Sequence, residues 1–226
     1  MYKVLRQSSF LTDASVRALD RSASDGYDVP RHHRHRLSGS QRALGSCDDP
    51  QGSAAKESSA ALSDGRSARI RPIKSTDIDA LGNFFFGLSK RTRVLRFHRL
   101  MVDFPHYLMR ELSDVDGERH VAFVAEAGFN HASLCAQIVG EGRYLRTADP
   151  SIAEFAISIA DGWQRLSLGT HLVRVLIAEA RTAAVKRLIG ETLLEDAAMQ
   201  LFALKFGARI THANERDGTY HLSLDI

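Results

Sequence analysis

Hydrophobic and polar residues alternate most regularly between residues 153 and 160. Phe155, Ile157 and Ile159 fall on one face of an expected strand, because successive side chains of an extended chain point to opposite faces. From residue 172 to residue 184 the apolar residues instead recur every three or four positions, with polar residues between them. Residues 153–184 therefore predict a strand, a turn and an amphipathic helix in that order.

The remainder of the chain from residue 67 shows the same two patterns. Pro72 favours an edge position for the strand that contains it, and Ser75 or Thr76 is expected to cap the helix that follows. A strand–helix–strand unit over 153–194 must be parallel, whereas the hairpins are antiparallel, so we expect an α/β fold with a mixed sheet and helices on both faces. The other expected strands are 68–73, 120–125, 134–145, 186–194, 208–212 and 219–226, and the other expected helices are 75–88, 90–98, 105–112 and 196–206.

Residues 1–66 differ from the rest in composition. They contain twelve serines, and their basic and acidic residues nearly balance. No apolar run in this segment could offset the entropy of ordering it, so we expect a mostly disordered tail rich in Ser, Arg and His. The cluster Arg31–Arg36 contains three histidines, but its arginines would repel a metal ion, and a solvated basic patch is the better interpretation. The sequence thus predicts one domain over 67–226 and no metal site.

Charge and cysteine content exclude several classes of function. The net charge of +3 is too small to indicate a nucleic-acid partner. Cys47 and Cys135 have neither a disulfide framework nor metal-ligand spacing. No leader sequence or membrane span is visible, so a cytoplasmic location without membrane contact is the expectation. Nothing in the sequence indicates an oligomeric state.

The turn between the expected strand and helix, Gln164–Thr170, suits a phosphate group. The first N–H groups of a helix have no partner within it, and the helix dipole adds positive charge at that end. Gly169 permits close approach of a ligand to the main chain. An ordinary strand-to-helix connection would have the same spacing, so both interpretations stay open on spacing alone.

The run WQRLSLGTHL at residues 163–172 resembles the acetyl-coenzyme A loop of the GNAT acetyltransferases, whose usual form is Gln/Arg-x-x-Gly-x-Gly/Ala. AEFAISIADGWQ and LIGETLLEDAAMQLFALKFGA resemble the GNAT domain of bacterial protein lysine acetyltransferases of the Pat type. The resemblance extends over about residues 68–208 and implies the GNAT fold, in which two central strands splay apart. It also implies acetyl-CoA as cosubstrate, with no metal. The implied acetyl-CoA-binding residues are Ile157, Ser158, Ile159, Gln164, Arg165, Leu166, Ser167, Leu168, Gly169, Thr170 and Asp196.

Glu154 is the candidate general base. A lysine ammonium with a pKa of about 10.4 must lose a proton before it attacks a thioester, at a cost of about 4.6 kcal/mol at pH 7. A carboxylate beside the acceptor could take that proton, and Glu154 matches the Glu that does so in Pat-type enzymes. The alternative is a strand-end glutamate that is exposed or pairs with Arg143. For the arginine-rich segment 90–98, a solvated helix face is the expected interpretation.

Three positions depart from the family pattern. Ser167 replaces the first glycine of the motif, Asp196 replaces an asparagine, and Ala203 occupies the place of a tyrosine that protonates the leaving thiolate in many GNAT enzymes. At Ser167 we expect a negative φ, which would allow the hydroxyl to add a donor. The resemblance implies an N-acetyltransferase whose acceptor is a protein lysine or, less in keeping with the pattern, a small amine. The departures leave open a catalytically weak module that binds acetyl-CoA as a sensor.

Overall fold

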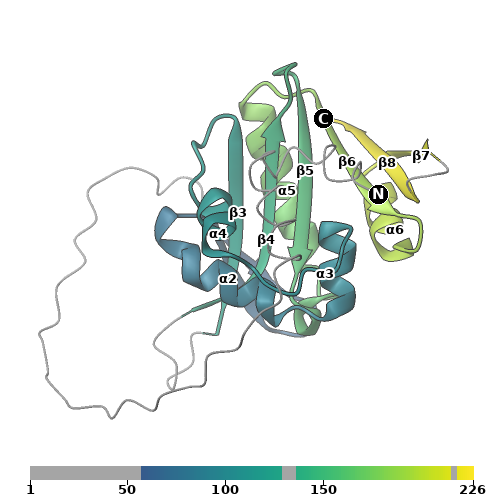
Figure 1. Cartoon of the computed structure of the whole chain (residues 1–226). Helices are drawn as coiled ribbons and strands as arrows, with labels where there is room; N and C mark the ends of the chain where they lie inside the picture. The colour runs from purple at the N-terminus through teal and green to yellow at the C-terminus, as the bar shows by residue number, and fades with distance from the viewer. Residues whose placement is uncertain (1–56, 129–135, 215–217) are drawn as a thin grey trace, which may run out of the picture.

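The computed structural model describes residues 57–128, 136–214 and 218–226. These residues form one mixed sheet in the order β1-β2-β3-β4-β5-β6-β8-β7 (Figure 1). Three features of the sequence lie outside the described residues: most of the expected disordered tail, the cluster Arg31–Arg36 and both cysteines. The strands are β1 (Ser58–Ala61), β2 (Ser67–Pro72), β3 (His120–Ala127), β4 (Gln137–Arg146), β5 (Ile152–Ile159), β6 (Arg187–Leu193), β7 (Arg209–Asn214) and β8 (Thr219–Asp225).

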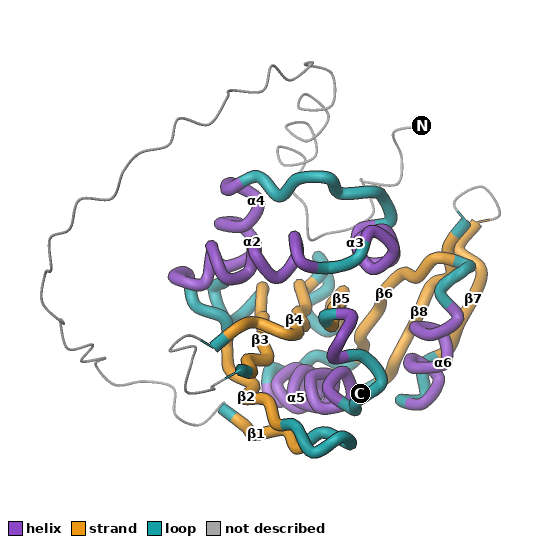
Figure 2. The backbone as a smooth tube through the Cα atoms, turned by 90° about the horizontal axis from the view of Figure 1, so that it is seen from below, coloured by secondary structure: helices purple, strands orange, loops and turns teal. Residues whose placement is uncertain are grey.

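Helices cover both faces of this sheet, and each face has its own apolar core. Figure 2 shows α2, α3 and α4 on one side of the strands and α5 on the other. Leu81, Phe85 and Leu108 form the centre of the first core, and Leu168 and Leu172 lie in the second. The α/β fold with a mixed sheet and helices on both faces is therefore confirmed. The helices are α2 (Ile78–Gly87), α3 (Lys90–Phe97), α4 (His106–Ser113), α5 (Leu168–Thr182) and α6 (Ala197–Lys205), with 3-10 turns η3 (Ser75–Asp77) and η4 (Asp161–Trp163).

Strands β5 and β6 pair over only a short distance and then separate. Their parallel register runs from Ile152↔Arg187 to Glu154↔Ile189. Beyond that point β6 continues its pairing with β8, while β5 continues to pair with β4 as far as Ile159. Because β5 has no strand beside it on the β6 side after Glu154 in the described chain, main-chain groups on that edge are left for a ligand.

The start of the domain differs from the expectation. Residues 57–66 were expected to belong to the disordered tail, but β1 pairs antiparallel with β2 along Ser58–Ala61, and Ala60 is buried. This part of the prediction is wrong because Ser and Ala give no apolar periodicity, and it is the ladder with β2 that makes this segment a strand. Because β1 pairs with it, β2 is not the edge strand that was expected. Pro72 is tolerated because β1 pairs with β2 only up to Ile70.

The entry to α2 also differs. Ser75 and Thr76 lie in η3, and α2 begins at Ile78. The carboxylate of Asp77 accepts a hydrogen bond from the Lys74 N–H at 2.8 Å and pairs with Arg71, which is buried. The cap expected at Ser75 or Thr76 was wrong: the N-cap residue of α2 is Asp77, whose carboxylate is bound by Arg71 and by the Lys74 N–H.

Candidate active site

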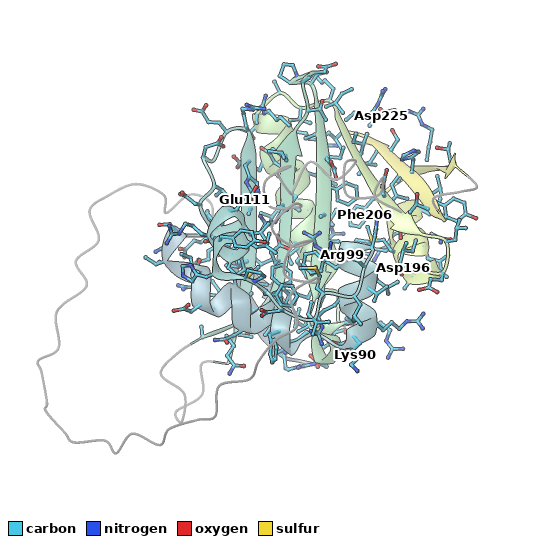
Figure 3. All side chains as sticks on the ribbon, viewed as in Figure 1. Lys90, Arg99, Glu111, Asp196, Phe206 and Asp225 are labelled. Atoms are coloured by element: carbon cyan, nitrogen blue, oxygen red, sulfur yellow. The ribbon has the colours of Figure 1, made fainter. Side chains whose placement is uncertain are left out.

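A cleft of about 600 Å³ opens where β5 and β6 separate. Its walls are the second half of β5, the turn before α5, one side of α3 and one side of α6. In Figure 3, Lys90 marks the start of α3, and Asp196 lies at the start of α6. The cleft lies at the broken pairing described above, so one ligand can contact the open edge of β5 and the start of α5 together.

The turn before α5 has an unusual backbone. Arg165 and Ser167 both have positive φ, 59° and 72°. The side chain of Gln164 donates from Nε2 to the carbonyl oxygen of Ile159 at 3.1 Å, which ties the turn to the end of β5. Left-handed residues next to right-handed ones direct successive N–H groups into one concavity, and such concavities bind anions.

The N-terminus of α5 is left open by its own side chains. Ser167 is the N-cap residue, but its side chain makes no capping hydrogen bond. By contrast, Ser89 caps α3 by accepting from the Thr92 N–H at 3.2 Å, and Asp196 caps α6 by accepting from the Met199 N–H at 3.0 Å. An uncapped N-terminus facing a cleft can supply its N–H groups and dipole to a phosphate.

The expectation of a negative φ at Ser167 was wrong. Its φ of 72° and ψ of −3° are left-handed, the region that favours glycine. The turn therefore has a backbone conformation that glycine would adopt without strain, and at Ser167 this conformation is strained. The hydroxyl does not cap the helix either.

The residues expected around acetyl-CoA gather in this cleft. Leu168 is fully buried and Leu166 packs against the same core, so these two turn their side chains inward and can offer only main chain. The carboxylate of Asp196 lines the cleft while it caps α6. The expected residues whose atoms line the cleft are Ile157, Ser158, Ile159, Gln164, Arg165, Ser167, Gly169, Thr170 and Asp196.

Comparisons with known proteins agree with this geometry. No protein-family model matches the chain. The crystal structure of the GNAT domain of S. lividans PAT superposes with a TM-score of 0.69 at 23% identity, over 78% of this chain and all of that domain. The chain therefore has the GNAT fold. A cAMP-binding acyltransferase from Mycobacterium smegmatis superposes with a TM-score of 0.52 at 20% identity, over 76% of this chain and 48% of that one.

Two curated relatives share sequence with this chain. An acetyltransferase of Pseudomonas aeruginosa is 35% identical over 120 residues, which are 53% of this chain and 63% of the relative. Acetyltransferase Pat of Mycolicibacterium smegmatis is 24% identical over 140 residues, 62% of this chain and 40% of the relative. The chain thus spans less than two thirds of the length of either relative.

Glu154 lies on the sheet face that α3 covers. It shares this face with Ala156 and Ser158, which line the cleft, and it is half-buried at the last pair before β5 and β6 separate. The alternative partner Arg143 contacts a different carboxylate, that of Glu141 on the same strand. Glu154 therefore lies beside residues that line the cleft.

A buried cluster of charges beneath α3 was missed from the sequence. Glu141 and Arg143 are both fully buried, and the Arg143 Nε donates to Glu141. The Arg143 Nη1 donates to the carbonyl of Leu112 at 2.9 Å and lies 2.9 Å from the Nε2 of His120. Arg96 adds a second guanidinium, with its Nη2 3.8 Å from the Glu141 Oε2.

Arg96 contradicts the expectation of a solvated α3 face. Only 9% of its side chain is exposed, and it lines the cleft. The available signal was the Glu141-x-Arg143 spacing within an otherwise apolar strand, which places two charges on one face of the sheet. Which helix supplies the third charge depends on packing, and the sequence does not show it.

Asp161 ties the start of α3 to the segment that follows β5. Its Oδ2 accepts from the Ser89 N–H at 2.8 Å, and its Oδ1 accepts from the hydroxyls of Ser89 and Thr92 at 2.8 and 2.6 Å. Burial acts to raise the pKa of Asp161, but the hydrogen bonds from Thr92 and Ser89 outweigh it and hold the pKa below its usual range. The negative charge also suits the N-terminus of α3.

On α6, the side that faces the cleft offers no hydroxyl. Ala203, the position of the family's tyrosine, is buried in the core, and Phe202 lines the cleft beside it. Lys205 also lines the cleft, and its Nζ lies 3.5 Å from the Thr170 Oγ1 in the first turn of α5. The sequence reasoning missed this cation, which lies at the end of α5 where an anion is expected.

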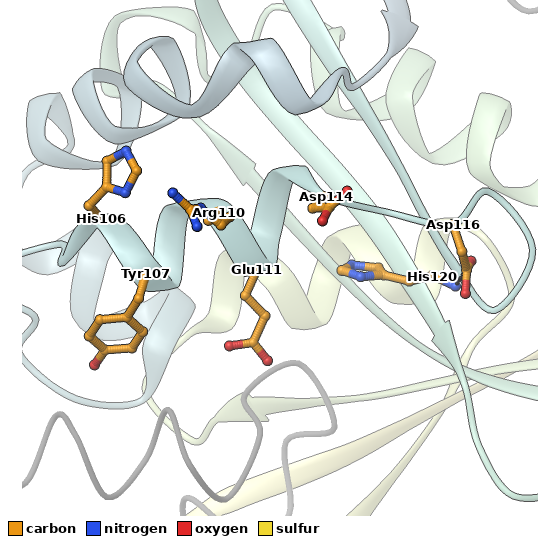
Figure 4. Close-up of a pocket in the computed structure, with 7 residues that line it drawn as sticks. All are labelled: His106, Tyr107, Arg110, Glu111, Asp114, Asp116 and His120. Atoms are coloured by element: carbon orange, nitrogen blue, oxygen red, sulfur yellow. Dashed lines mark hydrogen bonds between the residues drawn. The ribbon is translucent and has the colours of Figure 1, made fainter.

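A second hollow, of about 640 Å³, lies over α4 and the start of β3 (Figure 4). It contains neither the turn before α5 nor any residue of β5, so it is separate from the cleft. His120 lies at its edge and, through Arg143, joins the buried cluster. Burial, and then the charge of Arg143, lower the pKa of His120 to about 4, so this imidazole is neutral at pH 7.

Two absences can be stated for the part of the chain that the structure describes. No group of three or more His, Cys, Asp or Glu residues there could hold a metal ion. No helix there is long and apolar enough to span a membrane.

Proposed function

We propose that this chain is an N-acetyltransferase that moves an acetyl group from acetyl-CoA to an amine, and that the acceptor is a protein lysine. The observation that carries the proposal is the cleft at the β5–β6 separation, which combines an open strand edge with an uncapped helix N-terminus. The GNAT fold and the two relatives named acetyltransferases support the same activity.

The residues of the cleft fit the parts of acetyl-CoA. On the side away from β4, the main chain of Ile157–Ile159 can pair with the amide groups of the pantetheine arm. The Ile159 carbonyl oxygen already accepts a hydrogen bond from Gln164. The N–H groups from Arg165 to Thr170 can hold the diphosphate, with Arg165 and Lys205 as cations beside it. Apolar side chains such as Phe202 and Met199 cover the far wall.

In the proposed reaction Glu154 takes a proton from the acceptor ammonium. The neutral amine nitrogen then attacks the thioester carbonyl carbon, the carbon–sulfur bond breaks, and the sulfur leaves as thiolate. In this proposal a main-chain N–H near Ile159 stabilises the oxyanion. Since α6 offers no hydroxyl at Ala203, the thiolate takes its proton from water, which an acidic thiol permits.

The test is a Glu154→Gln variant assayed with acetyl-CoA and lysate protein, with acetylated lysines detected by mass spectrometry. We expect turnover to fall by about 10²–10⁴-fold, the usual share of a general base, while acetyl-CoA binding by calorimetry is retained. Glu118→Gln, at an exposed loop residue, is the matched control and should keep wild-type turnover. Undiminished turnover in Glu154→Gln would show that Glu154 is not the general base.

A binding module that senses acetyl-CoA is the second candidate, favoured by the absence of a hydroxyl on α6 at Ala203. Such a module would bind acetyl-CoA and yield no acetylated product with protein or with a panel of small amines. Acetylation of small amines but not of protein would instead show that the acceptor is a small amine and not a protein lysine.

A further inference from the structure

Ser158 has a buried hydroxyl that no step of the reaction proposed above uses. The residue is 4% exposed, and its Oγ has no hydrogen-bond partner among the residues that the structure describes. A buried hydroxyl without a partner costs folding free energy, and such groups are uncommon in native proteins. Because Ser158 also lines the cleft, its hydroxyl is available for a hydrogen bond to a ligand there.

The side chain beside Ser158 on the neighbouring strand does not engage this hydroxyl. Glu141 on β4 is the residue directly paired with Ser158, and directly paired residues of antiparallel strands point to the same face of the sheet. The Glu141 carboxylate instead accepts a hydrogen bond from the Nε of Arg143. The hydroxyl therefore lies next to the buried charges beneath α3 without being bonded to them.

The place of Ser158 on β5 suits the reacting end of the cosubstrate. Its side chain shares with Glu154 the face that α3 covers, whereas Ile157 and Ile159 pack into the core on the α5 side. Along the strand Ser158 lies between Glu154, where the pairing with β6 ends, and the turn before α5. In the proposed complex the diphosphate is at that turn and the pantetheine arm follows the open edge of β5 towards the base. The thioester end therefore lies on the stretch of β5 that contains Ser158.

The other hydroxyls of the cleft are engaged or lie elsewhere. The two at the start of α3 donate to Asp161. Ser167 and Thr170 belong to the turn and the first turn of α5, where the diphosphate is proposed to bind. Thr192 lies on β6, on the opposite face of the sheet from the base. The hydroxyl residues that line the cleft are Ser89, Thr92, Ser158, Ser167, Thr170 and Thr192.

We propose that the Ser158 hydroxyl donates a hydrogen bond to the carbonyl oxygen of the acetyl thioester and is a second donor to the oxyanion. The inference rests on the proposed function, in which a main-chain N–H near Ile159 is the first donor. When the amine nitrogen attacks the carbonyl carbon, the carbon–oxygen double bond becomes single and the oxygen takes the negative charge. The hydroxyl keeps its proton throughout, and its hydrogen bond is strongest at this stage because the acceptor is then charged.

Thermal unfolding separates this role from a structural one. Ser158→Ala removes a buried hydroxyl that has no partner, so the Tm of the full chain should not fall below that of wild type. Ser113→Ala is the matched control. This serine on α4 is 1% exposed, lies outside the cleft and donates to the Met109 carbonyl at 2.8 Å. Its replacement should lower the Tm and leave turnover unchanged.

Turnover and binding test the contact itself. The ligands are acetyl-CoA and S-ethyl-CoA, a thioether that lacks the carbonyl oxygen. In Ser158→Ala we expect kcat to fall by about 10²-fold, the usual effect of losing one oxyanion donor. By calorimetry the Kd of acetyl-CoA should rise by about three- to ten-fold, as for one lost hydrogen bond. The Kd of S-ethyl-CoA should stay within about two-fold.

Two results overturn the role of Ser158: a wild-type kcat in Ser158→Ala, or the same change of Kd for both ligands. A fall in Tm like that of Ser113→Ala would show that the hydroxyl has a structural partner, which also contradicts the proposal. If Ser158→Ala does not fold, Ser158→Cys replaces it, because a thiol is of similar size but a weak donor, and it should lose kcat and acetyl-CoA affinity in the same directions. If the wild-type chain acetylates neither protein nor amines, the proposed function fails, while the two Kd values still decide whether Ser158 contacts the carbonyl oxygen.

Discussion

Replacing Ser167 with glycine tests the strained turn most directly. A left-handed conformation costs an L-residue about 1–2 kcal/mol, and Ser167 has a φ of 72° without a capping hydrogen bond in return. Glycine removes this cost, but its greater freedom in the unfolded chain offsets about 0.4–1 kcal/mol. The net gain in the free energy of unfolding is therefore about 0.5–1 kcal/mol, or roughly 1–4 °C in Tm for a domain of this size.

Thermal unfolding followed by circular dichroism measures the effect. Ala184→Gly is the matched control, because Ala184 also has a positive φ, 61°, but lies beyond the far end of α5 and outside the cleft. Both glycine variants should gain similar stability. Ser167→Ala should melt close to wild type, since the hydroxyl makes no cap.

Affinity for coenzyme A separates strain from ligand contact. The turn is left-handed without ligand, so relief of strain stabilises the free and the bound protein equally, and the Kd should change by less than about two-fold. If Ser167→Gly melted below wild type while Ala184→Gly melted above it, the serine would stabilise the turn through a contact of its own. The reasoning about strain would then be refuted.

Three further predictions concern buried charges. Asp77→Asn should lower the free energy of unfolding by about 3 kcal/mol, because it leaves Glu126 as the remaining carboxylate partner of the buried Arg71. Urea denaturation at pH 7 measures this, and Asp225→Asn, in exposed pairs with Arg187 and Arg209, should have a much smaller effect. Burial acts to raise the pKa values of Asp77 and Glu126, but the hydrogen bonds from Arg71 outweigh it and the pKa values are lowered. These two carboxylates therefore stabilise the folded state fully above about pH 4, and this stabilisation is lost as the pH falls further. A Glu126→Gln chain that lost stability below pH 4 as steeply as wild type would contradict this. The pKa of His120 falls from 6.5 to about 4 on folding. As the pH is lowered, the unfolded chain therefore takes up this proton first, and the free energy of unfolding should decrease between pH 6.5 and about pH 4. In urea titrations His120→Gln should flatten that decrease, and an unchanged slope would show that His120 is not its source.

Local pattern was enough for the elements that form the cleft. The alternation at 155–159 and the helical spacing after residue 172 are properties of neighbouring residues, so strand β5 and helix α5 were predicted close to their observed bounds. The cap of α6 by Asp196 is equally local, because it joins residues three positions apart. The face of Glu154 also follows from the period of a strand alone.

Long-range packing decided the remainder. The separation of β5 from β6 after Glu154 depends on pairing between strands far apart in sequence. The left-handed Ser167 depends on the path that joins β5 to α5, and β1 forms only because β2 offers it a ladder. Arg96 joins Glu141 and Arg143 only when α3 is laid across the sheet. Sequence periodicity shows on which face of a strand or helix a side chain lies. Which residue it meets on that face depends on tertiary contacts between distant segments, and a local pattern does not reveal these contacts.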